Sequence, residues 1–125
     1  IRGKGELILF VDDNQQVQEV GEGILESLGY RVLKASNGLE AVDVFIAHQN
    51  EISLIITDVV MPKLGGVEAI ERIKEMHPDI KVIFLTGYDK GSISSNRIPS
   101  SEYTVLTKPF SVDSLSKTIR NQLKT

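Results

Sequence analysis

Five short apolar runs alternate along the chain with longer stretches in which apolar residues have helical spacing. Most of the runs are continuously apolar, which is typical of strands buried on both faces of a sheet. The predicted strands are Leu7–Val11, Tyr30–Ala35, Leu54–Thr57, Val82–Leu85 and Val105–Thr107.

Between these runs, apolar residues recur at three- and four-residue intervals and mark one face of each of four helices. The four stripes are Val17, Val20, Ile24, Leu25 and Leu28; Leu39, Val42, Phe45 and Ile46; Val67, Ile70, Ile73 and Met76; and Val112, Leu115, Ile119 and Leu123. Gly29 follows the first helix, where a left-handed residue often ends a helix, and Ser111 is placed to cap the last one. The segment Gly87–Ser101 holds two Gly, five Ser and Pro99, which predicts a short or frayed helix.

Strands that alternate with helices predict an α/β fold, a doubly wound five-stranded parallel sheet with helices on both faces. We expect a single domain over residues 1–125 with its core at about 6–123, excised from a longer protein because the chain starts at Ile1 on a Gly/Lys stretch. Ligands of such sheets bind beyond the carboxyl ends of the strands. The polar residues that end the strands are therefore the first candidates for function.

Composition narrows the possible functions. The chain has 125 residues and a net charge of −3 with its basic residues scattered, which argues against direct nucleic-acid binding. It contains no cysteine, which excludes disulfides and thiolate metal sites and favours the cytoplasm. The apolar runs are too short to span a bilayer, so we expect no membrane contact by this domain.

Polar side chains follow four of the predicted strands: Asp12-Asp13, Asp58, Thr86 and Lys108-Pro109. Each alone is a common turn, cap or surface residue, and the argument depends on their meeting at one edge of the sheet. Three carboxylates within about 5 Å of one another repel by roughly 3 kcal/mol per pair at an effective dielectric near 20. A divalent cation relieves this repulsion, and an open, all-oxygen site suits Mg²⁺. Together with a lysine, such a site is suited to moving a phosphoryl group.

These motifs, in this order, resemble the receiver domains of two-component response regulators (CheY-like) over nearly the whole chain. The residues that carry the resemblance are Leu9-Phe10-Val11-Asp12-Asp13, Asp58-Val59-Val60-Met61-Pro62, Gly65-Gly66, Thr86 and Lys108-Pro109-Phe110. The lead-in Gly3–Glu6 is similar to the one before receivers at the C-terminal ends of hybrid sensor histidine kinases.

The resemblance implies that Asp58 accepts a phosphoryl group from a phosphohistidine on a sensor histidine kinase or a histidine phosphotransfer protein. It implies a Mg²⁺ site in which Asp13 is a direct ligand, Asp12 acts largely through water, and the backbone carbonyl of Val60 completes the protein's share together with Asp58. Lys108 is implied to pair with the phosphoryl oxygens, and Thr86 to hydrogen-bond one of them. The domain alone is then no enzyme, although it promotes its own phosphorylation and dephosphorylation. A weak homodimer is compatible with the family.

Two features depart from the family pattern. Receivers usually have Tyr or Phe three residues before the lysine, and this chain has Val105, with Tyr103 two residues earlier. The Ser-rich segment Ser92–Ser101 is also atypical. Both features concern the output surface and leave the phosphorylation chemistry intact.

Three other functions compete with the receiver hypothesis. A non-phosphorylated pseudo-receiver that acts as a protein-interaction module is the main alternative. The presence of all five chemical positions argues against it, and Val105 keeps it open. A phosphatase of the haloacid dehalogenase type needs a second Asp two residues after the first, where this chain has Val60. A flavodoxin-like cofactor domain needs a phosphate-binding loop after the first strand, where Asp12 and Asp13 would repel a phosphate.

Overall fold

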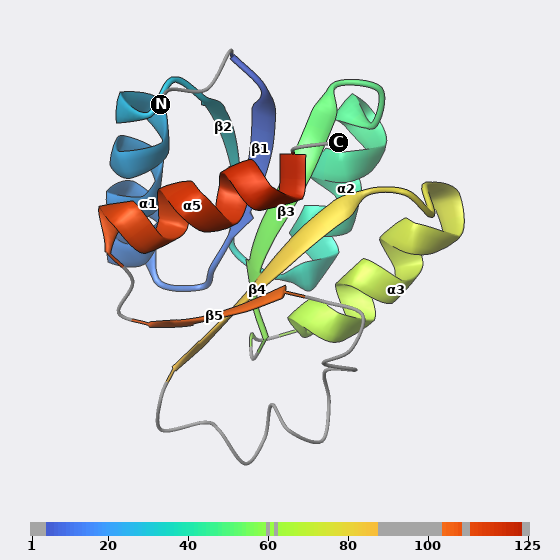
Figure 1. The fold of residues 1–125 in the computed structure, drawn as a ribbon. Coiled ribbons are helices and arrows are strands. Elements are labelled where there is room, and N and C mark those ends of the chain that lie inside the picture. The colour runs from blue at the N-terminus through green and yellow to red at the C-terminus, as the bar shows by residue number, and fades with distance from the viewer. Residues whose placement is uncertain (1–4, 60, 62, 88–103, 109–110, 124–125) are drawn as a thin grey trace.

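Five parallel strands form one sheet in the order β2-β1-β3-β4-β5 in the computed structural model of the chain (Figure 1). The structure describes residues 5–59, 61, 63–87, 104–108 and 111–123. The strands are β1 Leu7–Val11, β2 Arg31–Ala35, β3 Ile52–Asp58, β4 Lys81–Gly87 and β5 Thr104–Lys108. The doubly wound parallel sheet predicted from the sequence is confirmed.

Helices cover both faces of the sheet. They are α1 Gln15–Ser27, α2 Gly38–His48, α3 Gly66–Met76 and α5 Val112–Leu123. Buried residues of α1 and α5 pack on one face of the sheet, and those of α2 and α3 pack on the other (Figure 1). This two-sided cover explains why the strands are apolar at successive positions.

The two cores are separated by the alternation of side chains along each strand. In β1, Ile8 and Phe10 belong to the core under α1 and α5, whereas Leu9 and Val11 belong to the core under α2 and α3. All four side chains are fully buried. In the sheet, β1 is paired on both sides, and its carboxyl end lies between the ends of β2 and β3.

A β-bulge interrupts the pairing of β1 with β3. Leu7 is level with Ile52, but Ile8 is level with Leu54, so the register passes over Ser53. The bulge reverses the alternation at this point, and Ile52 and Ile55 therefore face the same core although they are an odd number of residues apart. Beyond the bulge the register is regular up to the pair Val11 and Thr57.

Caps define the helix ends much as the sequence predicted. The side chain of Asn14 accepts a hydrogen bond from the N–H of Val17 at the start of α1. Gly29, with φ of 95°, ends the same helix in the left-handed conformation, and the N–H of Tyr30 donates to the Leu25 carbonyl. Ser111 caps α5, because its hydroxyl accepts from the N–H of Ser114.

Several residues of the predicted helix stripes are exposed instead of buried. Val20 is 58% exposed and Ile46 is 49% exposed, and Leu39, Met76 and Val112 are also largely exposed. Of the buried residues of α1, Gln18 and Gly21 lie one position beyond Val17 and Val20 of the apolar stripe, whereas Leu25 belongs to the stripe. The stripes predicted the helices and the centres of their buried faces, such as Phe45, Ile70 and Leu115, but not which residues at the margins are exposed, because that depends on the sheet below.

Some expectations concern residues outside the described part of the chain. The short helix within Gly87–Ser101, the Ser92–Ser101 segment, Tyr103 and Pro109 belong to this group. Among the residues that the structure does describe, no helix is both long and apolar enough to cross a membrane.

Candidate functional site

The topology brings the carboxyl ends of β1 and β3 together. The two strands are neighbours at the point where the chain reverses its direction of progress across the sheet, and Val11 is level with Thr57. The next residues, Asp12 and Asp58, therefore leave the two strands at the same level. Ligands of open α/β sheets bind at this reversal point.

Three carboxylates meet there. Asp12, Asp13 and Asp58 each offer an oxygen atom, and these atoms lie within 4.8 Å of one another. Asp12 is buried, Asp58 is half-buried and Asp13 is exposed. The cluster thus extends from the edge of the core to the surface, so that a cation could reach it from solvent.

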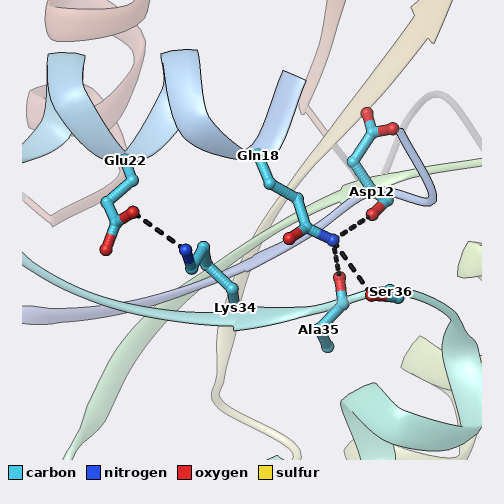
Figure 2. Close-up of polar contacts among 6 residues, drawn as sticks. All are labelled: Asp12, Gln18, Glu22, Lys34, Ala35 and Ser36. Atoms are coloured by element: carbon cyan, nitrogen blue, oxygen red, sulfur yellow. Dashed lines mark hydrogen bonds and ion pairs between the residues drawn. The ribbon is translucent and has the colours of Figure 1, made fainter. Parts of the chain in front are cut away.

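Hydrogen bonds from both backbone and side-chain donors fix the Asp12 side of the cluster. The N–H of Asn14 donates to Asp12 Oδ1 at 2.9 Å. The N–H of Asp12 donates to the Ala35 carbonyl at 3.1 Å, which extends the pairing of β1 and β2 by one residue. The carbonyl of Asp12 accepts a hydrogen bond of 2.6 Å from the Gln18 side chain (Figure 2). Asp12 is thus held at its main chain and at its side chain.

The Asp58 side is fixed mainly by backbone atoms. The N–H of Val59 donates to Asp58 Oδ1 at 2.8 Å, which sets the orientation of the carboxylate. The N–H of Gly66 donates to the Val59 carbonyl at 2.8 Å and brings the start of α3 against the end of β3. A Cβ atom on Gly66 would overlap the carbonyl oxygen of Asp58, so the close approach requires glycine at this position.

The donor set fits Mg²⁺. All three groups offer carboxylate oxygens, which are the ligands that hard divalent cations prefer, and the exposed side leaves room for water. Asp12, Asp13 and Asp58 would hold such an ion. The carbonyl of Val60, the fourth predicted ligand, lies outside the described residues.

The other two predicted site residues lie on the neighbouring strands. Thr86 is buried near the end of β4 and follows Leu85, which is level with Asp58. Lys108 ends β5, level with Gly87, and the structure describes its backbone only. Val105, at the position where receivers usually have an aromatic ring, is 39% exposed on the edge strand.

Sequence reasoning assigned no role in the site to two residues that shape it. Gln18 is a buried polar residue on α1, and Gly66 allows α3 to approach Asp58. The signal for Gly66 was present in the Gly65-Gly66 pair before α3, but glycine there also suits a turn. Gln18 is next to Val17 of the apolar stripe of α1, and its burial depends on which side of the helix packs against the sheet.

Comparison with known proteins identifies the family. The family model described as "Response regulator receiver domain" matches residues 8–120. The sensor kinase CckA of Brucella abortus is 33% identical over 117 residues, which are 94% of this chain but only 12% of that protein. The response regulator receiver protein CpdR of the same organism is 31% identical over 116 residues, which are 93% of this chain and 95% of that protein.

A solved structure agrees in fold along nearly the whole chain. The receiver domain of the sensor histidine kinase PA1611 from Pseudomonas aeruginosa PAO1 superimposes with a TM-score of 0.86 at 28% identity, covering 97% of this chain and 99% of that one. That structure contains a magnesium ion coordinated in the active site cleft. The chain belongs to the response regulator receiver domain family.

Proposed function

We propose that this domain is a phosphoacceptor in a two-component phosphorelay, in which Asp58 takes a phosphoryl group from a phosphohistidine with the help of Mg²⁺. The observation that carries the proposal is the meeting of Asp12, Asp13 and Asp58 at the reversal point of the sheet. A cluster of three acidic groups is costly unless a cation binds to it. Asp58 is its half-buried member, at the end of β3 between β1 and β4.

Each residue contributes position or charge. When bound, Mg²⁺ supplies positive charge that offsets the negative charge of the carboxylates and of the incoming phosphoryl oxygens. The Val59 N–H holds one oxygen of Asp58, so the carboxylate stays in one orientation for attack on phosphorus. One Asp58 oxygen forms the new bond to phosphorus while the bond from phosphorus to the donor's imidazole nitrogen breaks. We assign Lys108 and Thr86 as donors to the phosphoryl oxygens.

The partner that fits this chemistry is a sensor histidine kinase or a histidine phosphotransfer protein. Homology to receivers of both stand-alone regulators and large sensor kinases supports a role in such a relay. We infer that the domain works in the cytoplasm, which agrees with the absence of cysteine from the sequence.

The direct test is phosphate uptake from a small-molecule donor. The domain is incubated with acetyl phosphate and Mg²⁺, and acid-labile phosphate is measured by mass spectrometry. We expect one phosphate per chain on Asp58, none in Asp58→Asn, and none when EDTA removes the metal. Asp13→Asn should also take up no phosphate, because it removes one of the three carboxylates of the cation site.

The same experiment decides against the proposal if it fails. A wild-type domain that is folded and binds Mg²⁺, but acquires no acid-labile phosphate, would be a pseudo-receiver that acts through protein contacts. Uptake by Asp13→Asn at the wild-type rate would show that the metal roles are assigned wrongly.

A further inference from the structure

Gln18 is a buried polar residue on a helix face that otherwise packs on the sheet. It is 8% exposed, whereas Gln15 and Gln16, on the same helix, are exposed. Figure 2 shows its side chain pointing from α1 toward the ends of β1 and β2. A burial of this kind needs a compensating set of hydrogen bonds, since an unpaired buried amide is costly.

The amide nitrogen of Gln18 meets three oxygen atoms. Nε2 has two hydrogen atoms for three acceptors, which are the Asp12 carbonyl at 2.6 Å, the Ala35 carbonyl at 3.2 Å and Ser36 Oγ at 3.2 Å, so two of the acceptors share a hydrogen (Figure 2). A rotated amide would direct its own oxygen at two carbonyl oxygens, which repel it. The donor orientation is therefore fixed by the surroundings, and the short bond to Asp12 is the dominant contact.

The contact with the Asp12 carbonyl acts on the next residue. That carbonyl belongs to the planar peptide unit that joins Asp12 to Asp13, so its direction determines the course of the chain into Asp13. The next peptide unit, which joins Asp13 to Asn14, is held as well, because the N–H of Asn14 donates to Asp12 Oδ1 at 2.9 Å. The loop is thus fixed before and after Asp13, whose own side chain is exposed.

The bonds from Gln18 are not needed to complete the sheet. The N–H of Asp12 already donates to the Ala35 carbonyl at 3.1 Å, so β1 and β2 are paired up to their ends without the glutamine. An apolar side chain at position 18 would satisfy the packing of α1, as Leu25 does two turns later. The hydrogen bond from the amide to the Asp12 carbonyl instead restrains the loop that carries Asp12 and Asp13.

We propose that Gln18 is a positioning residue for the acidic site: its amide holds the Asp12–Asp13 peptide unit so that the Asp13 carboxylate is presented to the cation. This inference rests on the proposed function of the cluster as a Mg²⁺ site. Gln18 touches neither the cation nor the phosphoryl group and acts through the main chain of Asp12.

The test compares Gln18→Met with Gln16→Met. Methionine has nearly the size of glutamine but no N–H donor, and Gln16 is a matched control because it is exposed on the same helix. Mg²⁺ alone is titrated into each protein by calorimetry, and thermal melting is followed by circular dichroism without metal. We expect Gln18→Met to weaken Mg²⁺ binding about tenfold, as supporting groups behind metal ligands commonly do. Gln16→Met should stay within about twofold of the wild type, the scatter typical of such comparisons.

A structural role alone would lower the melting temperature of Gln18→Met and leave the Mg²⁺ affinity of the folded protein unchanged, and that result overturns the proposal. Gln18→Asn provides a second variant if the methionine fails to fold. It keeps the amide but is shorter by one methylene, so it should also weaken Mg²⁺ binding, and unchanged affinity in that variant overturns the proposal equally.

The measurement separates this inference from the proposed function. If the wild type binds Mg²⁺ but takes up no phosphate, the phosphoacceptor function fails, and the ratio of Mg²⁺ affinities still decides the role of Gln18. If the wild type binds no Mg²⁺ at millimolar concentration, both proposals fail.

Discussion

Two loops carry the acidic residues, and they are held by different means. The loop after β1, residues 12–14, is fixed by side chains, because Asp12, Asn14 and Gln18 each hydrogen-bond to backbone atoms around it. In the described part of the loop after β3, the contacts run mainly from backbone to backbone, apart from the bond of the Val59 N–H to the Asp58 side chain. The N–H of Gly66 donates to the Val59 carbonyl, and the N–H of Gly38 donates to the Leu64 carbonyl at 2.9 Å.

The difference predicts opposite sensitivities to mutation. When one side chain is truncated, a loop held by side chains loses only the stability that one hydrogen bond contributes, about 1 kcal/mol. A loop held by close backbone approach tolerates no additional atoms, since close-packed main chains have little room to move apart. Truncation therefore tests the first loop, and enlargement tests the second.

The largest effect is expected for Gly66→Ala. Its Cβ atom would overlap the Asp58 carbonyl oxygen, so α3 must move away from β3. We expect a loss of about 3 kcal/mol in the free energy of unfolding, measured in urea, and slower phosphate uptake. Gly23→Ala is the matched control, since Gly23 is exposed in α1 with no atom within 4 Å of its Cβ position, and it should gain about 1 kcal/mol. Equal stability of the two variants would contradict the role of Gly66.

The acidic residues themselves should destabilise the metal-free protein. In EDTA, Asp13→Lys should raise the free energy of unfolding by about 1–2 kcal/mol and the melting temperature by roughly 4–8 °C, because it removes repulsion within the cluster. Asp58→Asn should act in the same direction by a smaller amount, since it also weakens the bond from the Val59 N–H. Lower melting temperatures for both variants would show that the carboxylates stabilise the fold without a cation.

Truncation of Asn14 tests the loop that is held by side chains. Asn14→Ala removes the acceptor for the Val17 N–H and should cost about 1 kcal/mol in urea unfolding, without a change in phosphate uptake greater than about threefold. Asn14→Ser keeps a capping oxygen and should recover most of the loss. A cost for alanine as large as that for Gly66→Ala would remove the distinction between the two loops.

The smallest effect is expected at Lys63. This residue has φ of 69° in the loop after β3, a left-handed conformation that costs a side chain about 1–2 kcal/mol. Lys63→Gly removes that cost but adds freedom to the unfolded chain, so the net gain should be about 0.5 kcal/mol by urea unfolding. Lys63→Ala should gain nothing, because alanine keeps the Cβ atom, and an equal gain from both would point to the lysine charge instead.

Sequence reasoning predicted the sheet and the acidic cluster because both depend on local signals. A continuously apolar run that stops at Asp12 or Asp58 marks a buried strand and its end, and parallel strands then bring the ends together. The strand bounds differ from those predicted by at most two residues at either end. The family resemblance, carried by the same residues, is confirmed by the match over residues 8–120.

The supporting contacts were not predictable because they depend on how the elements fit together. Val20 belongs to the apolar stripe of α1 but is exposed, and Gln18 lies outside the stripe but is buried. The face of α1 that lies on the sheet includes Gly21, whose Cβ position overlaps the ring of Phe10. Gln18 and Gly21 are both buried on this face, and the hydrophobic pattern of the helix does not predict the burial of either residue.

The β-bulge at Ser53 has a consequence for insertions and deletions in the gene. Because the register of β1 and β3 passes over Ser53, loss of that one codon would leave Ile52 level with Leu7 and Leu54 level with Ile8, with every later pair intact. Loss of Ile55 instead would shift the remaining residues of β3 by one position and direct Ile56 toward the wrong core. Deletion of Ser53 would therefore shorten this strand by one residue and keep Asp58 beside Asp12.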